Sequence, residues 1–477
     1  MTFRTGSACV VAIVAMSMAL AAAPGLQPST SDLRIDAIFA PWNTKDSPGC
    51  ALGVFRDGAM AYAKGYGMAS LEHDLPNAPD TVFYAGSVSK QFTAMAAALA
   101  IQQGKLAYDD PIRKYLPELP PYADAIKVRH LLHHTSGLRD YNTLLSIAGR
   151  RDEDAWDNRV VLQMTAKQTQ LNFTPGDEYL YSNTGYTLLA TIVERATGTK
   201  FAAFADANIF KPLGMEVTHY HVDARRLVRH RALAYGGRAG QWTLDTPINE
   251  RAGAGGLYTS IPDLLKWDEN FYTGRVGGPE VLKKLQTPGT LNDGKTLAYA
   301  WGLQIGDYRG LPIVEHSGSL GGYRAHVIRF PSRHTSVALL CNASTIAPTT
   351  LARRVADIVL ADTLTAPAPA PAMAGSGGGT VETPPPATMP AGASLADYAG
   401  TYESREVEGA FTVTVDGLKL MLKREADPEP AVMQQGSAPD QFRARGLVIR
   451  FQRDAARKIV ALSVDAGRVR EIKFTKR

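Results

Sequence analysis

The chain has 477 residues, of which 45% are hydrophobic and 20% charged, and its net charge at pH 7 is only +5. These values are typical of an ordinary globular protein, and the length suggests about three domain-sized units. The basic residues are dispersed, and the densest cluster, within residues 225–231, contains no Phe, Tyr or Trp. We therefore interpret this cluster as a solvated segment and expect no nucleic-acid partner.

The N-terminus has the pattern of a secretory signal peptide. Arg4 is followed by an apolar run over residues 8–20 and by small residues up to Ala23, which predicts a signal peptide over residues 1–23 with cleavage near Ala23. The apolar run is shorter than the roughly 20 residues that span a bilayer. We expect a periplasmic or secreted protein with no stable membrane span after cleavage; an uncleaved anchor is the open alternative.

Strand patterns occupy the two ends of residues 31–362, and helical patterns lie between them. A sheet built from both ends, with a helical subdomain beside it, predicts an α+β domain whose active site lies in the cleft between the two parts. The expected elements are a helix over 31–39, two strands joined at Asp57-Gly58, helices between Ser87 and about Asn270, strands over 311–315, 325–330 and 336–341, and a last helix over 349–361.

Two cysteines remain after the signal peptide, and each lies in a strand-like run. Cys50 begins one run and Cys341 ends the other. If these strands are antiparallel neighbours, the start of one faces the end of the other, and a disulfide can form. Two buried thiols are an equally open alternative, because cysteine is often a core residue.

The last part of the chain predicts a second folded unit. Residues 363–395 form a linker rich in Pro, Ala and Gly, which cannot bury enough surface for a core. Residues 396–477 contain short alternating strands separated by turns, which predicts a small antiparallel β-barrel. The linker also predicts few contacts across this boundary, so that the first unit folds without the barrel. The barrel either docks over the mouth of the cleft or binds a ligand in the cell envelope.

Ser87 and Lys90 form a Ser-x-x-Lys motif at the start of an Ala-rich helical pattern. Residues i and i+3 share one face of a helix, so the lysine amine can reach the serine hydroxyl. Burial of Lys90 would favour its neutral form, which is the basic one. The pair predicts a serine nucleophile; for the motif alone, a helix-cap serine is the alternative.

Two further motifs follow, Tyr181-x-Asn183 and His316-x-Gly318. The Tyr181 phenol can hydrogen-bond the serine and protonate the leaving group if neighbouring cations lower its pKa. The Asn183 amide can bind a polar group of an acyl substrate and faces the same side as Tyr181 if the segment is extended. Gly318 has no side chain and would let a substrate backbone approach the strand closely.

The order Ser-x-x-Lys, Tyr-x-Asn, His-x-Gly resembles that of the serine penicillin-recognising enzymes. Over residues 31–362 the chain is most similar to the class C β-lactamase-related branch, with its penicillin-binding proteins, D-Ala-D-Ala carboxypeptidases, D-aminopeptidases and esterases. Residues 131–138 and 253–265 also look like segments of this family. The resemblance implies an oxyanion hole formed by the backbone N–H groups of Ser87 and Ser319. It also makes the barrel similar to a lipocalin-like module.

The third motif departs from the usual β-lactamase pattern, because His316 stands where a lysine is usual. A mostly neutral imidazole holds a substrate carboxylate less well than an ammonium group, which speaks against antibiotic hydrolysis as the main activity. Arg324 is a candidate for the carboxylate contact. We expect no cofactor and no metal, because His130 and His134 have a helical zinc spacing but no acidic partner.

Together the motifs predict an exported serine hydrolase that acts through an acyl-enzyme on amide or ester substrates. The substrate would be a small molecule or peptide: a D-amino-acid peptide or a small ester, with weak β-lactam hydrolysis as a further option. Lys90 and Tyr181 would move the protons, and the sequence leaves open which of them is the base. The oligomeric state is also open. The alternative is a penicillin-binding-like sensor module that acylates without turnover.

Overall fold

The structure, a computed structural model, describes residues 1–2, 29–150, 156–248, 250–367, 390 and 393–477. Most of the predicted signal peptide and most of the predicted linker therefore lie outside the described residues. Within the described part, no helix is both long enough and apolar enough to cross a membrane.

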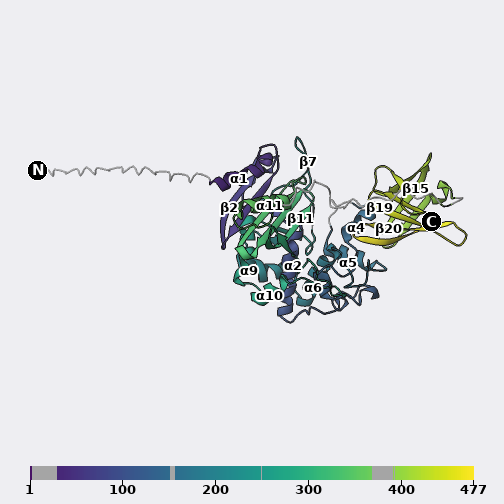
Figure 1. The fold of residues 1–477 in the computed structure, drawn as a ribbon, viewed down its shortest axis with the longest axis horizontal. Helices are drawn as coiled ribbons and strands as arrows, with labels where there is room; N and C mark the ends of the chain where they lie inside the picture. The colour runs from purple at the N-terminus through teal and green to yellow at the C-terminus, as the bar shows by residue number, and fades with distance from the viewer. Residues whose placement is uncertain (3–28, 151–155, 249, 368–389, 391–392) are drawn as a thin grey trace.

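A six-stranded antiparallel sheet forms the middle of the first unit and combines strands from both ends of that unit (Figure 1). In the register between β1 and β13, Cys50 lies opposite Cys341, and a disulfide joins the two residues. The choice left open by the sequence is thus decided in favour of the disulfide. In sheet order, the strands are β10 (Gln304–Tyr308), β11 (Leu311–Leu320), β12 (Tyr323–Phe330), β13 (Thr335–Cys341), β1 (Cys50–Arg56) and β2 (Ala59–Tyr66).

Helices cover both faces of this sheet, which explains why β13 is buried along its whole length and β1 is buried up to Phe55. Successive side chains of a strand point to opposite faces. Along β1, Leu52 and Val54 therefore enter the core beneath α1 and α11, whereas Ala51 and Phe55 enter the core that contains α2 and α9. These helices are α1 (Thr30–Phe39), α2 (Ser89–Gln102), α9 (Ile261–Thr273) and α11 (Pro348–Val359), and α10 (Gly278–Leu285) packs against α2 and α9.

The helical subdomain lies beside the sheet and supplies the other side of the first unit (Figure 1). The predicted fold, a sheet from both ends with helices inserted between them, is confirmed. The subdomain contains α3 (Val128–Leu132), α4 (Tyr141–Ile147), α5 (Asn158–Ala166), α6 (Asn183–Thr197), α7 (Phe201–Ala205) and α8 (Lys211–Leu213). Three small sheets accompany it among the described residues: β3 (Met68–Ser70) with β4 (Leu75–Pro76); β5 (Phe83–Tyr84), β9 (Leu257–Thr259) and β6 (His219–Tyr220); and β7 (Tyr235–Arg238) with β8 (Gln241–Leu244).

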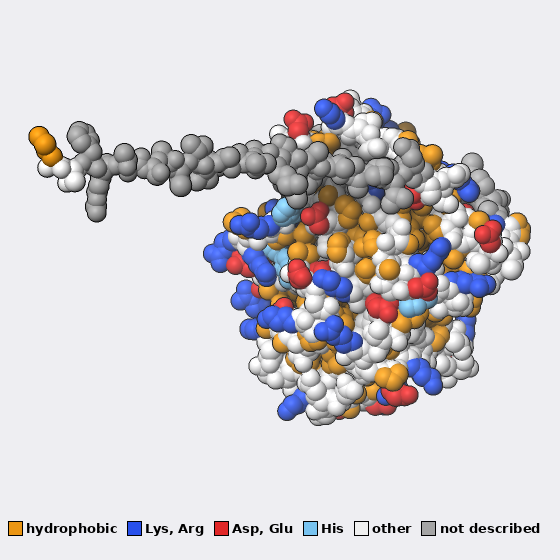
Figure 2. Space-filling view, turned by 90° about the vertical axis from the view of Figure 1, so that its left-hand side faces the viewer, with side chains coloured by type: hydrophobic (Ala, Val, Ile, Leu, Met, Phe, Trp, Pro, Cys, Tyr) orange, Lys and Arg blue, Asp and Glu red, His pale blue; other side chains and the backbone are white. Residues whose placement is uncertain are grey.

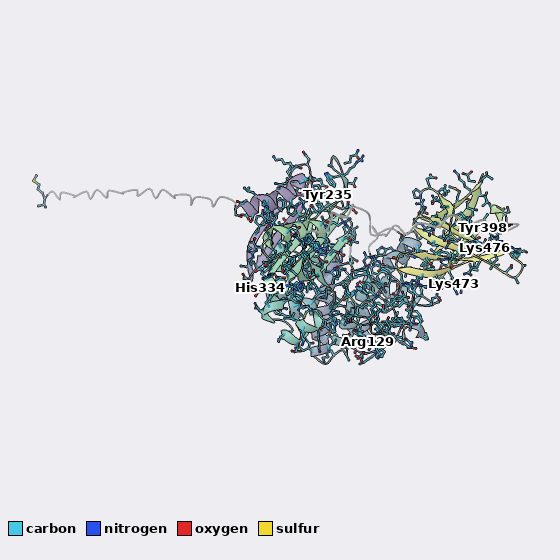
Figure 3. All side chains as sticks on the ribbon, in the orientation of Figure 1. Arg129, Tyr235, His334, Tyr398, Lys473 and Lys476 are labelled. Atoms are coloured by element: carbon cyan, nitrogen blue, oxygen red, sulfur yellow. A yellow bond between two sulfur atoms is a disulfide. The ribbon has the colours of Figure 1, made fainter. Side chains whose placement is uncertain are left out.

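Strands β14 to β21 close into an antiparallel barrel, which confirms the predicted second unit. Its interior is packed with side chains, among them Phe411 and Phe474, whose ring centroids lie 4.3 Å apart. Tyr398 lies on the barrel, at the opposite end of the molecule from His334 (Figure 3). The described residues give no support for a ligand of this unit. The strands are β14 (Gly400–Ser404), β15 (Gly409–Asp416), β16 (Lys419–Arg424), β17 (Ala431–Gln435), β18 (Gln441–Ala444), β19 (Leu447–Arg453), β20 (Ile459–Ala466) and β21 (Val469–Lys476), and the short helix α12 (Leu395–Tyr398) precedes them.

The barrel packs directly against α4 and α5 (Figure 1). Leu144, Ile147 and Val161 belong to the same buried cluster as the barrel core. Beneath this contact, Arg139 is 0% exposed and forms a 2.6 Å ion pair with Glu406 of the barrel. The expectation of few contacts between the two units is therefore wrong, because the apolar faces of α4 and α5 are covered by the barrel.

The surface carries charges of both signs. On the face shown in Figure 2, Lys and Arg side chains lie among Asp and Glu side chains. The dispersion of basic residues along the sequence thus corresponds to dispersion in space on this face.

Candidate active site

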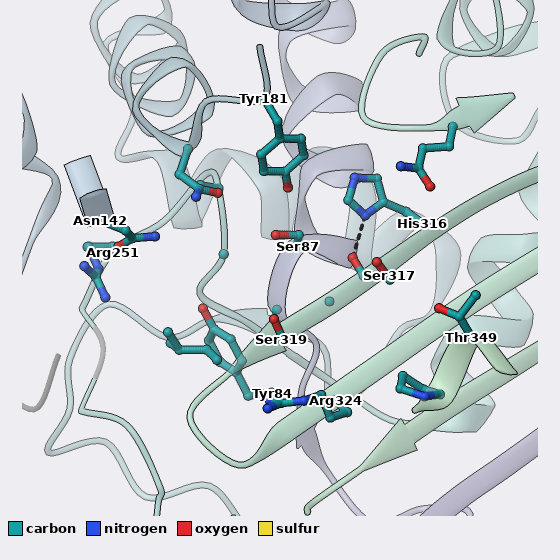
Figure 4. A pocket seen from close by; sticks show the side chains of 18 of the residues that line it. Tyr84, Ser87, Asn142, Tyr181, Arg251, His316, Ser317, Ser319, Arg324 and Thr349 are labelled. Atoms are coloured by element: carbon teal, nitrogen blue, oxygen red, sulfur yellow. Dashed lines mark hydrogen bonds between the residues drawn. The ribbon is translucent and has the colours of Figure 1, made fainter. Parts of the chain in front are cut away.

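The three sequence motifs meet in one cleft of about 520 Å³ between the sheet and the helical subdomain (Figure 4). Ser87 lies in the turn before α2, Tyr181 in the segment before α6, and the third motif on β11. The Tyr181 hydroxyl points toward Ser87. The predicted residues that line the cleft are Ser87, Tyr181, Asn183, His316, Gly318, Ser319 and Arg324.

Lys90 lies one helical turn beyond Ser87 and is completely buried. Its Nζ atom is 3.0 Å from Ser87 Oγ, 2.9 Å from Asn183 Oδ1 and 2.8 Å from the Ala254 carbonyl oxygen. Burial holds the pKa of Lys90 well below its ordinary value. A neutral amine has two N–H groups, which the Asn183 and Ala254 oxygens can accept. Its lone pair is then left for the Ser87 hydroxyl proton.

Tyr181 stays protonated in this environment. Burial raises the pKa of its phenol, and this effect outweighs the hydrogen bond with Ser87 and the positive charge of Arg468, which both lower it. The ring centroid lies 4.7 Å from Lys90 Nζ and 5.1 Å from Arg468 Cζ. The expectation that a neighbouring cation, with Lys90 as the obvious one, lowers this pKa is therefore wrong. Only Arg468 acts as such a cation, and desolvation is the larger effect.

His134 supports Tyr181 from the α3 side of the site. The two ring centroids are 4.2 Å apart, and His134 Nδ1 accepts a hydrogen bond from the Ser182 N–H at 3.0 Å. His130, the other half of the histidine pair, caps α3 by accepting from the Lys127 N–H at 3.1 Å. Among the described residues, no group of three His, Cys, Asp or Glu side chains is placed to hold a metal ion.

Asn183 is the first residue of α6, so the backbone is extended at Ser182 but no longer at Asn183. The condition under which Asn183 and Tyr181 would face the same side of an extended segment is therefore not met. The Ser182 hydroxyl accepts from the Gly185 N–H at 3.3 Å and so caps the helix. The Asn183 N–H donates to Asp140 Oδ2 at 2.7 Å, and its side-chain oxygen accepts from Lys90. Asn183 therefore orients Lys90, and no described residue accepts a hydrogen bond from its NH2 group, which a substrate oxygen could reach.

Two glycines bring the nucleophile turn against β11. A Cβ atom on Gly318 would lie 2.1 Å from the Ala85 carbonyl oxygen and 2.9 Å from the Ser87 nitrogen. Gly86 has a φ of +55°, and a Cβ atom there would lie 2.4 Å from the Ser319 nitrogen. The Ser87 and Ser319 N–H groups therefore lie close together, as an oxyanion hole requires. Gly318 makes room for the nucleophile turn, which is a different reason from the substrate approach that we expected.

His316 is a neutral residue in this cleft. Burial, with a smaller contribution from Lys90, lowers its pKa to about 3. Its Nδ1 lies 2.6 Å from the Ser317 carbonyl oxygen, which makes Nδ1 the donor, and Nε2 accepts from the Tyr299 hydroxyl at 3.1 Å. With both nitrogens engaged, His316 supplies no positive charge to a substrate carboxylate.

Three arginines among the described residues line the cleft, and only Arg324 was predicted from the sequence. The Nη1 atom of Arg324 donates to the Gly321 and Tyr323 carbonyl oxygens, at 2.7 Å each. Arg251 lies over the Tyr141 ring, with Cζ 5.1 Å from the centroid. The third is Arg468, from the barrel. No local pattern marks Arg251 or Arg468 as site residues, because each reaches the cleft only through the folding of distant segments.

A family model described as Beta-lactamase matches residues 35–362. The chain belongs to this family. Among curated relatives, a D-aminopeptidase of Gluconobacter oxydans (strain 621H) is 29% identical over 297 residues, covering 62% of this chain and 56% of the relative. Penicillin-binding protein 4* of Bacillus subtilis (strain 168) is 30% identical over 302 residues, covering 60% of this chain and 66% of the relative. The chain thus spans between about half and two thirds of the length of these relatives.

Solved structures show the same fold. The octameric penicillin-binding protein homologue from Pyrococcus abyssi has a TM-score of 0.60 at 23% identity and covers 93% of this chain and 99% of its own. The D-amino acid amidase from Ochrobactrum anthropi SV3 has a TM-score of 0.60 at 22% identity. The matched region covers 70% of this chain and 99% of the amidase chain. The first of these likenesses extends beyond the β-lactamase-like unit into the barrel.

Proposed function

We propose that this protein is an exported serine hydrolase that forms an acyl-enzyme at Ser87 and turns over amide or ester substrates. The observation that carries this proposal is the buried Lys90 amine, 3.0 Å from Ser87 Oγ. Its lowered pKa makes Lys90, and not the protonated Tyr181, the base that activates the serine. Desolvated lysines are known bases of this kind.

In the acylation step, Ser87 Oγ attacks the substrate carbonyl while its proton passes to Lys90. The Ser87 and Ser319 N–H groups donate to the oxyanion that develops, a contribution that is often the largest in such reactions. The C–N or C–O bond then breaks as the Tyr181 phenol gives its proton to the leaving group, and the proton on Lys90 restores the phenol. Water then attacks the acyl-enzyme while its proton passes to Lys90. Lys90 returns this proton to Ser87 Oγ as the C–O bond to the serine breaks and the acid is released.

The substrate class that we propose is a D-amino-acid peptide or amide, with a small ester as the second option. Relatives named D-aminopeptidase and a structural neighbour named D-amino acid amidase support the first class. Hydrolysis of β-lactams would be weak at most, because neutral His316 replaces the usual lysine of the third motif. Export is supported by the N-terminal signal pattern and by the Cys50–Cys341 disulfide, since disulfides persist mainly in oxidising compartments.

Active-site labelling and turnover measured on the same preparations test this proposal. A chromogenic ester and a D-aminoacyl amide should label Ser87 as an acyl-enzyme, detected by mass spectrometry, and should be turned over many times. Ser87→Ala should abolish both readouts. Lys90→Ala and Tyr181→Phe should each lower kcat by orders of magnitude, and the double variant should be scarcely worse, because the residues act as a unit.

The outcomes separate the proposal from its alternatives. One equivalent of product per protein, with a stable label on Ser87, would identify a sensor that acylates without turnover. Near-normal turnover by Ser87→Ala would refute the assignment of the nucleophile.

A further inference from the structure

The hairpin between β20 and β21 brings the barrel to the edge of the cleft. Asn172 holds the backbone where the turn passes into β21, donating to the Arg468 carbonyl oxygen at 3.0 Å and accepting from the Arg470 N–H at 2.9 Å. Arg470 forms a two-pronged ion pair with Glu178, at 3.1 and 2.9 Å. These contacts fix the hairpin without using the side chain of Arg468.

The Arg468 side chain is directed into the cleft and lines it. Its Nη1 atom lies 3.2 Å from Asp140 Oδ2, and its Cζ atom lies 5.1 Å from the centroid of the Tyr181 ring. The side chain remains 40% exposed. No other described residue accepts a hydrogen bond from its guanidinium group, so most of its N–H donors remain available at the cleft.

The other basic groups of the cleft are less available. Lys90 is buried with its amine engaged, His316 is neutral, and the Nη1 atom of Arg324 is committed to backbone carbonyls. Arg251 is almost completely buried. In addition, none of the described residues that line the cleft is an Asp or Glu. The cleft is therefore suited to an anionic group, and Arg468 is the guanidinium best placed to bind it.

We propose that Arg468 is a specificity-determining residue that binds a carboxylate of the acyl substrate. The barrel would in this way supply the positive charge that the third motif lacks. This inference rests on the proposed function, because the carboxylate must lie beside an acyl group held at Ser87. A planar guanidinium binds carboxylates through paired N–H donors, and the open donors of Arg468 fit that geometry.

Reversible binding of arylboronic acids tests Arg468 without requiring turnover. The boron atom accepts a lone pair of Ser87 Oγ to form a tetrahedral adduct, while the hydroxyl proton passes to Lys90. We would measure Kd by calorimetry for phenylboronic acid and for 3-carboxyphenylboronic acid on the full-length chain. A charge-assisted contact should favour the carboxylated compound by about tenfold or more in the unmodified protein.

Four variants separate recognition from structure. Arg468→Gln should reduce the preference, measured as the ratio of the two Kd values, to within about threefold. Arg468→Lys should keep part of this preference, because a lysine retains the charge but not the paired donors. Arg470→Gln, on the same hairpin but outside the cleft, is the matched control and should keep the full preference. Ser87→Ala should lose binding of both acids.

The possible failures are distinguishable. Equal weakening of both acids by Arg468→Gln, or an unchanged preference, would overturn the carboxylate contact and leave the serine chemistry intact. Binding that survives in Ser87→Ala, or no binding to the unmodified protein, would overturn the nucleophile assignment and the Arg468 contact with it.

Discussion

Two walls of the cleft, one formed by the sheet and α2 and the other by the barrel, are built in different ways. In the wall formed by the sheet and α2, Lys90 is completely buried, and β11 packs against the nucleophile turn at Gly318, where there is no room for a Cβ atom. The wall formed by the barrel is a hairpin tip, fixed by polar contacts, whose Arg468 side chain remains 40% exposed. One wall is a packed interior and the other is a docked surface.

This difference separates the chemistry from the recognition. A shifted lysine pKa and converging N–H donors need a dry and rigid environment, which only a continuous core supplies. A contact to a substrate carboxylate needs reach and open donors, which a docked hairpin can offer. Asp140 and Asn183 connect the two walls. The Asp140 carboxylate accepts from Arg468 and from the Asn183 N–H, and the Asn183 side-chain oxygen accepts from Lys90 of α2.

Removal of the barrel should have the largest effect. A chain truncated after Ala366 exposes the apolar faces of α4 and α5 and leaves Arg139 without Glu406. We expect aggregation or loss of cooperative unfolding, measured by size-exclusion chromatography and thermal melting, and loss of Ser87 labelling. As a control, the full-length chain cut at a protease site inserted in the linker should keep the barrel bound. A truncated chain that labels Ser87 at the normal rate would show that the barrel wall is dispensable.

Gly318→Ala should break the packed wall. The added Cβ atom meets the Ala85 carbonyl oxygen at 2.1 Å, so β11 must move away from the nucleophile turn and separate the two oxyanion donors. Loss of one such donor typically lowers kcat by about 10²- to 10³-fold. Gly306→Ala on the neighbouring strand is the control, because its Cβ atom would make only ordinary contacts, the nearest at 3.7 Å to Ile313. Comparable losses of kcat in both variants would contradict this account.

Glu406→Gln tests how firmly the docked wall is held. Glu406 neutralises the fully buried Arg139 and also accepts from the Thr169 N–H at 3.0 Å. Breaking a buried ion pair on one side costs about 3–5 kcal/mol, so the free energy of unfolding in urea should fall by about 3 kcal/mol, since glutamine keeps some hydrogen bonding. Glu408→Gln disrupts an exposed pair with Lys167 and should cost less than about 1 kcal/mol. Equal costs would mean that the Arg139 contact does not anchor the barrel.

The smallest effect is a pair of opposite pH shifts. The Asp140 charge raises the pKa of Lys90 and the Arg468 charge lowers it, both against the larger lowering by burial. If neutral Lys90 is the base, activity is lost as the pH falls through its pKa. Asp140→Asn should then move the acidic limb of kcat/KM to lower pH, and Arg468→Gln should move it to higher pH. Shifts in the same direction would indicate that another group controls this limb.

The sequence by itself determined those parts of the protein that depend on short spacings. Ser87 and Lys90 are three residues apart on one helix, so their contact follows from helical geometry. The barrel was predictable because alternation along each strand records which side faces a core. Predicting the disulfide also required the pairing of β1 with β13, which the sequence indicated only as one of two alternatives.

Only the tertiary structure decided the second wall of the cleft. Asp140 and Arg468 are 328 residues apart, and nothing near either residue indicates the other. The proline-rich linker predicted two separate units, yet α4 and α5 complete their cores against the barrel. The protonation of Lys90, Tyr181 and His316 also depends on burial by distant segments. Local periodicity records which side of an element is buried, but the partner that buries it is chosen by packing of the whole chain.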